Sequence, residues 1–119
     1  MILADTSVWI DHLRHGNPRM KQLLLAESVA CHPFVIGELA CGSLGNRERI
    51  LSLIQALPAL PVAEGKEILY FIENHRLMGR GLGFIDVHLL ASARLAAAPL
   101  WTLDKRLRKA AQELELDGA

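Results

Sequence analysis

The sequence has few aromatic residues, only two cysteines and no excess of charge of either sign. Aromatic side chains make up 5% of the 119 residues, so we expect an aliphatic core. Cys31 and Cys41 form no CxxC pair and lack a matching pair of histidines, which excludes a zinc knuckle and a disulfide scaffold. Thirteen Lys and Arg balance thirteen Asp and Glu. This balance argues against a non-specific nucleic-acid coat, because such binding depends on neutralising phosphates.

Long hydrophobic runs are also missing. No stretch reaches the ~18 uninterrupted apolar residues that a membrane span requires. The first residues, MILAD, carry no basic group and meet an acid at Asp5, which does not fit a signal peptide. We expect both cysteines to be small buried thiols. Because they do not form a disulfide framework, we also expect a reduced, cytoplasmic protein with no membrane partner.

What the chain does have is enough apolar sequence for one folded domain. The hydrophobic fraction is 51% and the mean hydropathy is +0.24, which excludes an intrinsically disordered chain. Domains average roughly 150 residues, so we expect a single domain over residues 1–119. No repeat or linker divides it.

Short apolar runs alternate with segments of helical periodicity. This alternation predicts an α/β fold, in which helices cover both faces of a parallel sheet. Strands are expected at residues 2–4, 28–31 and 100–103, with an edge strand at 59–62 between two prolines. Helices are expected at residues 6–13, 18–27, 34–42, 47–57, 64–78, 85–97 and 105–114.

Four acidic residues stand alone in uncharged stretches, whereas the other acids lie on charged helix faces. They are Asp5, Glu38, Asp86 and Asp104. An ionised carboxylate in such surroundings costs several kcal/mol unless something compensates its charge. Asp5 and Asp104 each follow an expected strand, and the other two lie in helices that follow strands or loops. Because strand ends and helix N-termini share one edge of a parallel sheet, the four acids could converge there.

A cluster of carboxylates restricts the chemistry of the site. Like charges disfavour one another's ionisation, so either some acids hold protons or a cation is present. Oxygen ligands suit Mg²⁺ or Mn²⁺ better than zinc. Such an ion points to phosphodiester hydrolysis, with Thr6, Ser7 and Thr102 available to orient water or a carboxylate.

A simpler interpretation stays open at this stage. Asp5 and Asp104 could be ordinary strand-to-helix caps, and Asp86 could interact with the dipole of its helix. Glu38 is harder to explain in this way, because a glutamate in the middle of a helix caps nothing. Composition and spacing alone leave a metal site and a set of caps as alternatives.

Four segments resemble the motifs of one family. Residues 2–10 (ILADTSVWI), 35–42 (VIGELACG), 83–93 (GFIDVHLLASA) and 100–107 (LWTLDKRL) are similar, in order and spacing, to those of PIN-domain ribonucleases, specifically the VapC-type toxins of bacterial toxin–antitoxin pairs. The resemblance spans nearly the whole chain. It implies a three-layer α/β/α sandwich with a small parallel sheet.

The resemblance also implies a function and its residues. Asp5, Glu38, Asp86 and Asp104 would be the catalytic acids that bind Mg²⁺ or Mn²⁺, with Thr102 and Ser7 supporting them. The expected activity is endonucleolytic cleavage of RNA by a metal-activated water. The expected partners are a cognate antitoxin and a second copy of the chain. One departure is that little sequence follows the last expected helix, which leaves little room for the final strand that many relatives have.

Basic residues near two of the motifs could hold RNA phosphates. Lys105 and Arg106 follow Asp104 directly, and Arg80 precedes Asp86 in a glycine-rich link. The alternative for each is a solvated helix face. A hydrophobic stripe over residues 34–54 is wider than one helix face needs, so it is either a partner-binding groove or plain core.

Two non-enzymatic functions compete with the nuclease. One is a catalytically silent PIN-like module that only binds its partner. The other is a receiver-like signalling domain, which has similar length and architecture but needs paired acids after the first strand. Here a single acid, Asp5, is followed by Thr6, which disfavours the receiver.

Overall fold

Three short parallel strands form the centre of the computed structural model, which describes residues 1–119. The central strand β1 (Ile2–Ala4) pairs with β2 (Val29–Ala30) on one side and with β3 (Leu100–Trp101) on the other. Ile2 lies opposite Val29, and Leu3 lies opposite Leu100. The strands fall within the predicted segments, although β2 and β3 are shorter.

Seven helices connect and follow the strands. Their bounds are Thr6–His15 (α1), Pro18–Leu25 (α2), Pro33–Cys41 (α3), Arg47–Gln55 (α4), Gly65–His75 (α5), Phe84–Ala96 (α6) and Lys105–Glu113 (α7). Each was predicted, but α4 ends two residues earlier than expected, and α2 and α5 end two and three residues earlier. Glu27 and Arg76 adopt left-handed backbone conformations, with φ of 54° and 51°, which end these helices.

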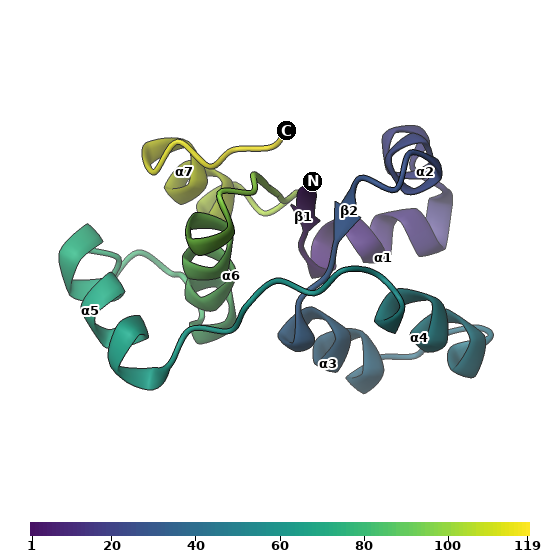
Figure 1. Ribbon diagram of the computed structural model, residues 1–119, viewed down its shortest axis with the longest axis horizontal. Coiled ribbons are helices and arrows are strands. Elements are labelled where there is room, and N and C mark those ends of the chain that lie inside the picture. Colours follow the sequence, from purple (N-terminus) through teal and green to yellow (C-terminus); the bar gives the residue numbers. More distant parts are fainter.

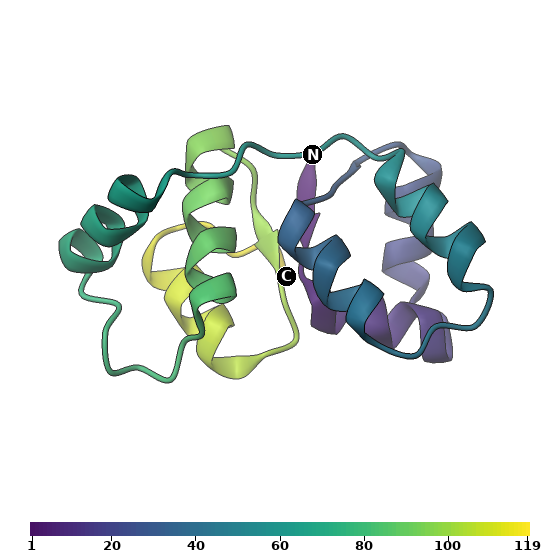
Figure 2. The same cartoon turned by 90° about the horizontal axis from the view of Figure 1, so that it is seen from below.

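The helices form one layer on each side of the strands. Helices α1 to α4 lie on one side and α5 to α7 on the other, and both views agree on this division (Figures 1 and 2). A parallel sheet needs both faces covered, because its strands are apolar throughout. All seven residues of the three strands are buried. The predicted three-layer α/β/α sandwich is therefore confirmed.

The core is aliphatic, as the composition predicts. Twenty-five buried hydrophobic residues form one cluster, and Trp9 and Trp101 are its two aromatic members. Of the two cysteines, Cys31 is buried but Cys41 is exposed at the end of α3, so the expectation that both are buried was wrong for Cys41. No helix is both long and apolar enough to cross a membrane.

The two outer edges of the sheet differ from the prediction. The expected strand at 59–62 is wrong, because only one isolated parallel bridge forms there, between Ala59 and Cys31. Leu60 N donates to Cys31 O, and Pro58 and Pro61 have no N–H groups with which to extend the ladder.

At the opposite edge the short C-terminus contributes more than expected. Asp117 forms a parallel bridge with Leu100. Leu100 N donates to Leu116 O at 2.7 Å, and Gly118 N donates to Leu100 O at 2.8 Å. A Cβ at Gly118 would lie 2.8 Å from Ile2 Cδ1, so the close approach of this segment depends on the missing side chain.

Candidate active site

Asp5 lies at the carboxyl end of β1 and begins α1. Its Oδ1 accepts hydrogen bonds from Val8 N at 3.2 Å and from Ser7 Oγ at 2.5 Å, and its Oδ2 accepts one from Thr102 Oγ1 at 2.5 Å. The side chain is almost wholly buried, with 5% of the residue exposed. Burial raises the pKa of this carboxyl, although the hydrogen bonds from Ser7 and Thr102 oppose the rise.

Thr102 and Ser7 connect Asp5 to the end of β3. Thr102 Oγ1 accepts from Asp104 N at 3.0 Å, and Ser7 Oγ accepts from Leu103 N at 2.9 Å. The two hydroxyl oxygens are 3.4 Å apart. Each hydroxyl thus donates to Asp5 and accepts from the backbone that follows β3. The loop before α7 is held against the start of α1 by this network.

Glu38 reaches the same edge from the other side of Asp5. It lies on an exposed face of α3, and its Oε1 accepts a hydrogen bond of 2.6 Å from Thr6 Oγ1. Thr6 is the residue that follows Asp5, so the hydroxyl fixes the Glu38 carboxylate beside the end of β1. Its second oxygen, Oε2, has no partner within the protein.

Asp86 occupies the first turn of α6, where Gly83 N donates to its Oδ2 at 2.9 Å. The residue is half-buried. Burial raises the pKa of Asp86, and the negative charges of Asp104 and Glu38 raise it further. Three acids from α3, α6 and the β3–α7 loop therefore act on one another electrostatically.

Asp104 is the N-cap of α7. Its Oδ1 accepts from Arg106 N at 2.9 Å and from Leu107 N at 3.0 Å. Asp5 and Asp104 thus cap their helices, as the simpler interpretation of the sequence proposed, and Asp86 accepts from Gly83 N at the start of α6. The caps nevertheless leave Oδ2 of Asp104 and Oδ1 of Asp86 without a protein partner, so capping does not use up these carboxylates.

The four acids thus gather around the carboxyl edge of the strands. No three Asp, Glu, His or Cys side chains are close enough to hold one ion among them. The donor set nevertheless suits a hard divalent cation, because it consists of carboxylates with free oxygens beside hydroxyl groups. Mg²⁺ in particular is commonly held by only one or two carboxylates, with waters and substrate phosphates completing its shell.

The predicted phosphate-binding residues have different environments. Lys105 and Arg106 are exposed in the first turn of α7. Arg106 also lies against the backbone of Gly81, where a Cβ would be 2.8 Å from its Nη1. Arg80 forms an ion pair of 2.8 Å with Glu113, so its charge is already partly neutralised.

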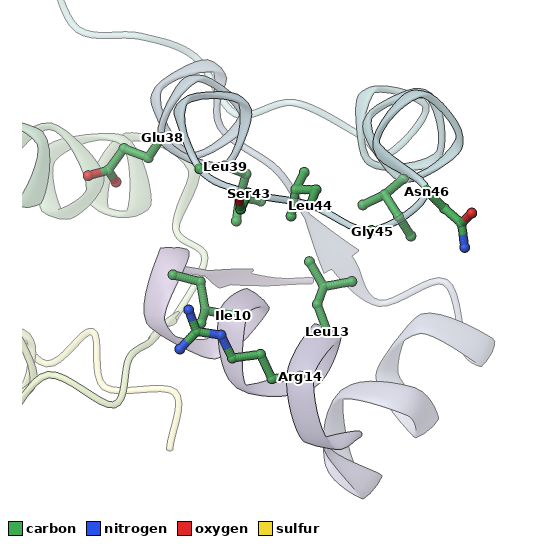
Figure 3. Close-up of a pocket in the computed structure, with 11 residues that line it drawn as sticks. Ile10, Leu13, Arg14, Glu38, Leu39, Ser43, Leu44, Gly45 and Asn46 are labelled. Carbon is green, nitrogen blue, oxygen red and sulfur yellow. The ribbon is translucent and has the colours of Figure 1, made fainter.

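A pocket of about 400 Å³ opens beside Glu38. Ile10, Leu13 and Arg14 of α1 line one wall, and Leu39 and Leu44 line the other, with Glu38 at one end (Figure 3). The pocket is bounded by α1, the end of α3 and the loop to α4. It places a surface of mixed polar and apolar side chains next to the acidic cluster.

One residue near the site was missed by the sequence analysis. His32 is fully buried between β2 and α3, where its Nδ1 accepts from Phe34 N at 3.0 Å. Its Nε2 lies 3.0 Å from Ser92 Oγ of α6. The available signal was local, because a polar residue between a strand and Pro33 occupies the usual position of a helix N-cap.

Comparison with known proteins places this arrangement in a family. The family model described as PIN domain matches residues 2–113. The chain belongs to the PIN-domain family. A curated relative in Mycobacterium tuberculosis (strain H37Rv), Ribonuclease VapC32, is 48% identical over 114 residues, which cover 95% of this chain and 92% of the relative. Strain CDC 1551 / Oshkosh has a relative of the same name and identity.

Solved structures agree with the fold of this PIN domain. PAE2754 from Pyrobaculum aerophilum aligns with a TM-score of 0.66 at 20% identity, over 92% of this chain and 83% of that one. The structure of FitAB bound to an IR36 DNA fragment aligns with a TM-score of 0.65 at 22% identity, over 94% of this chain and 91% of that one. FitAcB from Neisseria gonorrhoeae aligns with a TM-score of 0.62 at 24% identity, over 94% of each chain. At these identities the likeness establishes the architecture alone.

Proposed function

We propose that this PIN domain is a metal-dependent endoribonuclease, the toxin of a toxin–antitoxin pair. The observation that supports the proposal is the position of the four acids on segments that adjoin the carboxyl edge of the sheet, where the charges of Asp104 and Glu38 raise the pKa of Asp86. The 48% identity to a protein named Ribonuclease VapC32 supports the reaction and the substrate class. The VapC-like motifs of the sequence contain all four acids.

Asp5, Glu38, Asp86 and Asp104 would hold Mg²⁺ or Mn²⁺, with at most two of them in direct contact with one ion and the others acting through its bound waters. When bound, the ion would lower the pKa of a water and stabilise negative charge on the departing oxygen. Ser7 and Thr102 keep Asp5 in one orientation by donating to both of its oxygens. Thr6 does the same for Glu38. Each carboxylate is therefore oriented before any ion or RNA arrives.

The raised pKa values of Asp5 and Asp86 have a consequence for metal binding. A carboxyl that is harder to ionise in the free protein releases its proton when a cation binds, so metal affinity should increase with pH. The cation also removes the mutual repulsion of Asp86, Glu38 and Asp104. The acidic cluster is thus suited to a cation and poorly suited to RNA alone.

Lys105 and Arg106 are the proposed phosphate contacts, because they are exposed immediately after Asp104. Arg80 could join them only by breaking its ion pair with Glu113. Cations at this rim would offset the repulsion between the carboxylates and the RNA backbone.

The proposed partners are a cognate antitoxin and a second copy of the chain, in the cytoplasm. An apolar hollow of about 300 Å³ lies between α1, α2 and α4, with Trp9, Leu24, Leu53 and Leu57 among its lining residues. Leu53 is 56% exposed. An exposed leucine in a concave apolar surface suits a bound peptide segment. The hydrophobic stripe of the sequence ends in this region, at Ile50 and Ile54.

Cleavage of a fluorogenic RNA by the purified protein tests the reaction. Activity should require added Mg²⁺ or Mn²⁺ and disappear with a chelator. Asp86→Asn and Asp104→Asn should each abolish it. Asp11→Asn is the matched control, because Asp11 bonds only to the Asn17 side chain. Equal cleavage by the parent and both site variants would refute the assignment of these residues. No cleavage by the parent, together with partner binding that needs no metal, would instead favour the silent binding module.

A further inference from the structure

Helices α3 and α6 carry Glu38 and Asp86, yet they belong to opposite layers of the sandwich. Helix α3 packs mainly against α1 and α4, whereas α6 packs mainly against α5 and β3. The separation of the two carboxylates therefore depends on whatever joins these helices directly. A single side-chain hydrogen bond does so, between His32 at the start of α3 and Ser92 of α6.

The protonation state of this link follows from its contacts. Nδ1 of His32 accepts the N–H of Phe34, so it carries no proton. Nε2 must then hold the ring proton and donate it to Ser92 Oγ. Burial lowers the pKa of His32 to about 4, and the nearby His88 lowers it in the same direction. The ring is therefore neutral near pH 7, as both hydrogen bonds require.

The position of the link suits a role in the site. His32 precedes Glu38 by six residues and Ser92 follows Asp86 by six residues, or about 9 Å along each helix. Both side chains are fully buried, at 0% exposure. The Phe34 ring packs edge-on against the His88 ring, with centroids 4.7 Å apart, and adds a second contact between the same helices. The link is thus buried and lies about 9 Å along the helix from each acidic residue.

We propose that the His32–Ser92 hydrogen bond is a positioning device, which fixes the separation of α3 and α6 and so places Glu38 and Asp86 for one divalent ion. The proposal rests on the proposed metal-dependent function. His32 and Ser92 touch neither ion nor substrate; they act through the helices that carry the acids. Partners of this kind commonly change metal affinity by about tenfold or more when they are removed.

Three variants separate the link from the helix cap. His32→Asn keeps an oxygen that can cap α3 but is too short to reach Ser92. Ser92→Ala removes the acceptor and leaves the cap intact. His32→Gln places an amide N–H near the original Nε2 position and should restore much of the link. Ile68→Val on α5 is the control, because it removes one buried methyl group from the core at a position outside both α3 and α6.

The main measurement is Mn²⁺ affinity in the absence of RNA, by electron paramagnetic resonance. His32→Asn and Ser92→Ala should each weaken binding about tenfold, and the double variant should be no weaker than either. His32→Gln should recover most of the affinity, and Ile68→Val should match the parent. In cleavage assays, the first two variants should lose kcat at low Mn²⁺, regain it at saturating Mn²⁺ and keep the parent KM for RNA.

Two results would overturn the positioning role. In the first, His32→Asn and Ser92→Ala bind Mn²⁺ as tightly as the control Ile68→Val does. This result counts if Asp5→Asn weakens Mn²⁺ binding, which shows that the ion occupies the proposed site. The other is a ¹⁵N spectrum of the parent that shows the His32 proton on Nδ1. Failure of the proposed function gives a different pattern, in which the parent and Asp5→Asn bind Mn²⁺ equally and neither cleaves RNA.

Discussion

The two halves of the acidic cluster are built differently. Around Asp5 the site is buried, and both carboxylate oxygens accept hydrogen bonds from Ser7, Thr102 and the backbone. Around Glu38, Asp86 and Asp104 the site is half-buried or exposed, and each carboxylate keeps one oxygen without a protein partner. The first half is fixed by the fold, whereas the second offers free ligands. A metal ion would therefore change the second half more than the first.

The largest expected effect comes from removing the charge of the fixed half. Asp5→Asn keeps an oxygen for Val8 N but loses one full negative charge at the proposed ion. Because a bound ion contributes several kcal/mol of transition-state stabilisation, cleavage should fall by roughly 100-fold or more. Initial rates on a short fluorogenic RNA measure this. A loss of less than about threefold would remove Asp5 from the proposed machinery.

Thr102→Val should have the next largest effect, because it removes the hydroxyl that joins Asp5 to the backbone of Asp104. The change is isosteric but leaves Asp5 Oδ2 and Asp104 N without their partner, which costs about 1–3 kcal/mol in a buried position. Urea unfolding at neutral pH measures the loss, and cleavage should fall with it. Thr102→Ser keeps the hydroxyl and is the control. Similar losses in both variants would mean that the lost hydrogen bonds are not the specific cause of the effect.

Thr6→Val tests the open half in the same way and should cost less stability. Its hydrogen bond to Glu38 is exposed, so the free energy of unfolding should fall by about 1 kcal/mol at most. Mn²⁺ affinity should fall, because the Glu38 carboxylate loses its orientation. A loss of stability equal to that of Thr102→Val would contradict the contrast between the halves.

Metal should stabilise the parent protein more than Asp5→Asn. Binding to the folded state alone raises the midpoint temperature of unfolding, and the increase grows with ion concentration. Thermal unfolding should be measured without Mg²⁺ and with about 5 mM Mg²⁺. The midpoint temperature should rise clearly for the parent and little for the variant. An identical shift in both would place the ion elsewhere.

The smallest expected effect concerns the metal-free protein. Burial raises the pKa of Asp5 above its unfolded value, so ionised Asp5 destabilises the folded state at neutral pH. Asp5→Asn without metal should therefore unfold at a slightly higher temperature than the parent at pH 7. The difference should shrink as the pH falls through the raised pKa and vanish below the ordinary value, 3.8. A difference that grows in acid would contradict this assignment.

Local sequence signals accounted for the elements and for the place of the acids. A short apolar run followed by Asp5 or Asp104 predicts a strand that ends at a helix N-cap, and both residues cap their helices. For Asp104 the two interpretations are compatible, because the cap uses Oδ1 and leaves Oδ2 without a protein partner. In Asp5 the second oxygen is also used, since it accepts from Thr102 Oγ1. The four roles proposed for the acids stay predictions until the variants are measured.

The edges of the sheet and the exposure of Cys41 were less accessible from sequence. Pro58 and Pro61 signalled an edge, but not that their missing N–H groups would reduce it to a single bridge. The C-terminal segment gains its bridge because Gly118 can approach Ile2 closely. Cys41 lies on the outer side at the end of α3, which only the packing of that helix decides.

The sequence by itself determined the order of strands and helices, the aliphatic core and the position of each acid at an element boundary, because these depend on residues near one another in the chain. Only the tertiary structure decided which side chains meet. Thr102 bonds to Asp5 across 97 positions and His32 to Ser92 across 60. Such pairs depend on strand order and helix packing, which bring distant segments together and which no local pattern encodes.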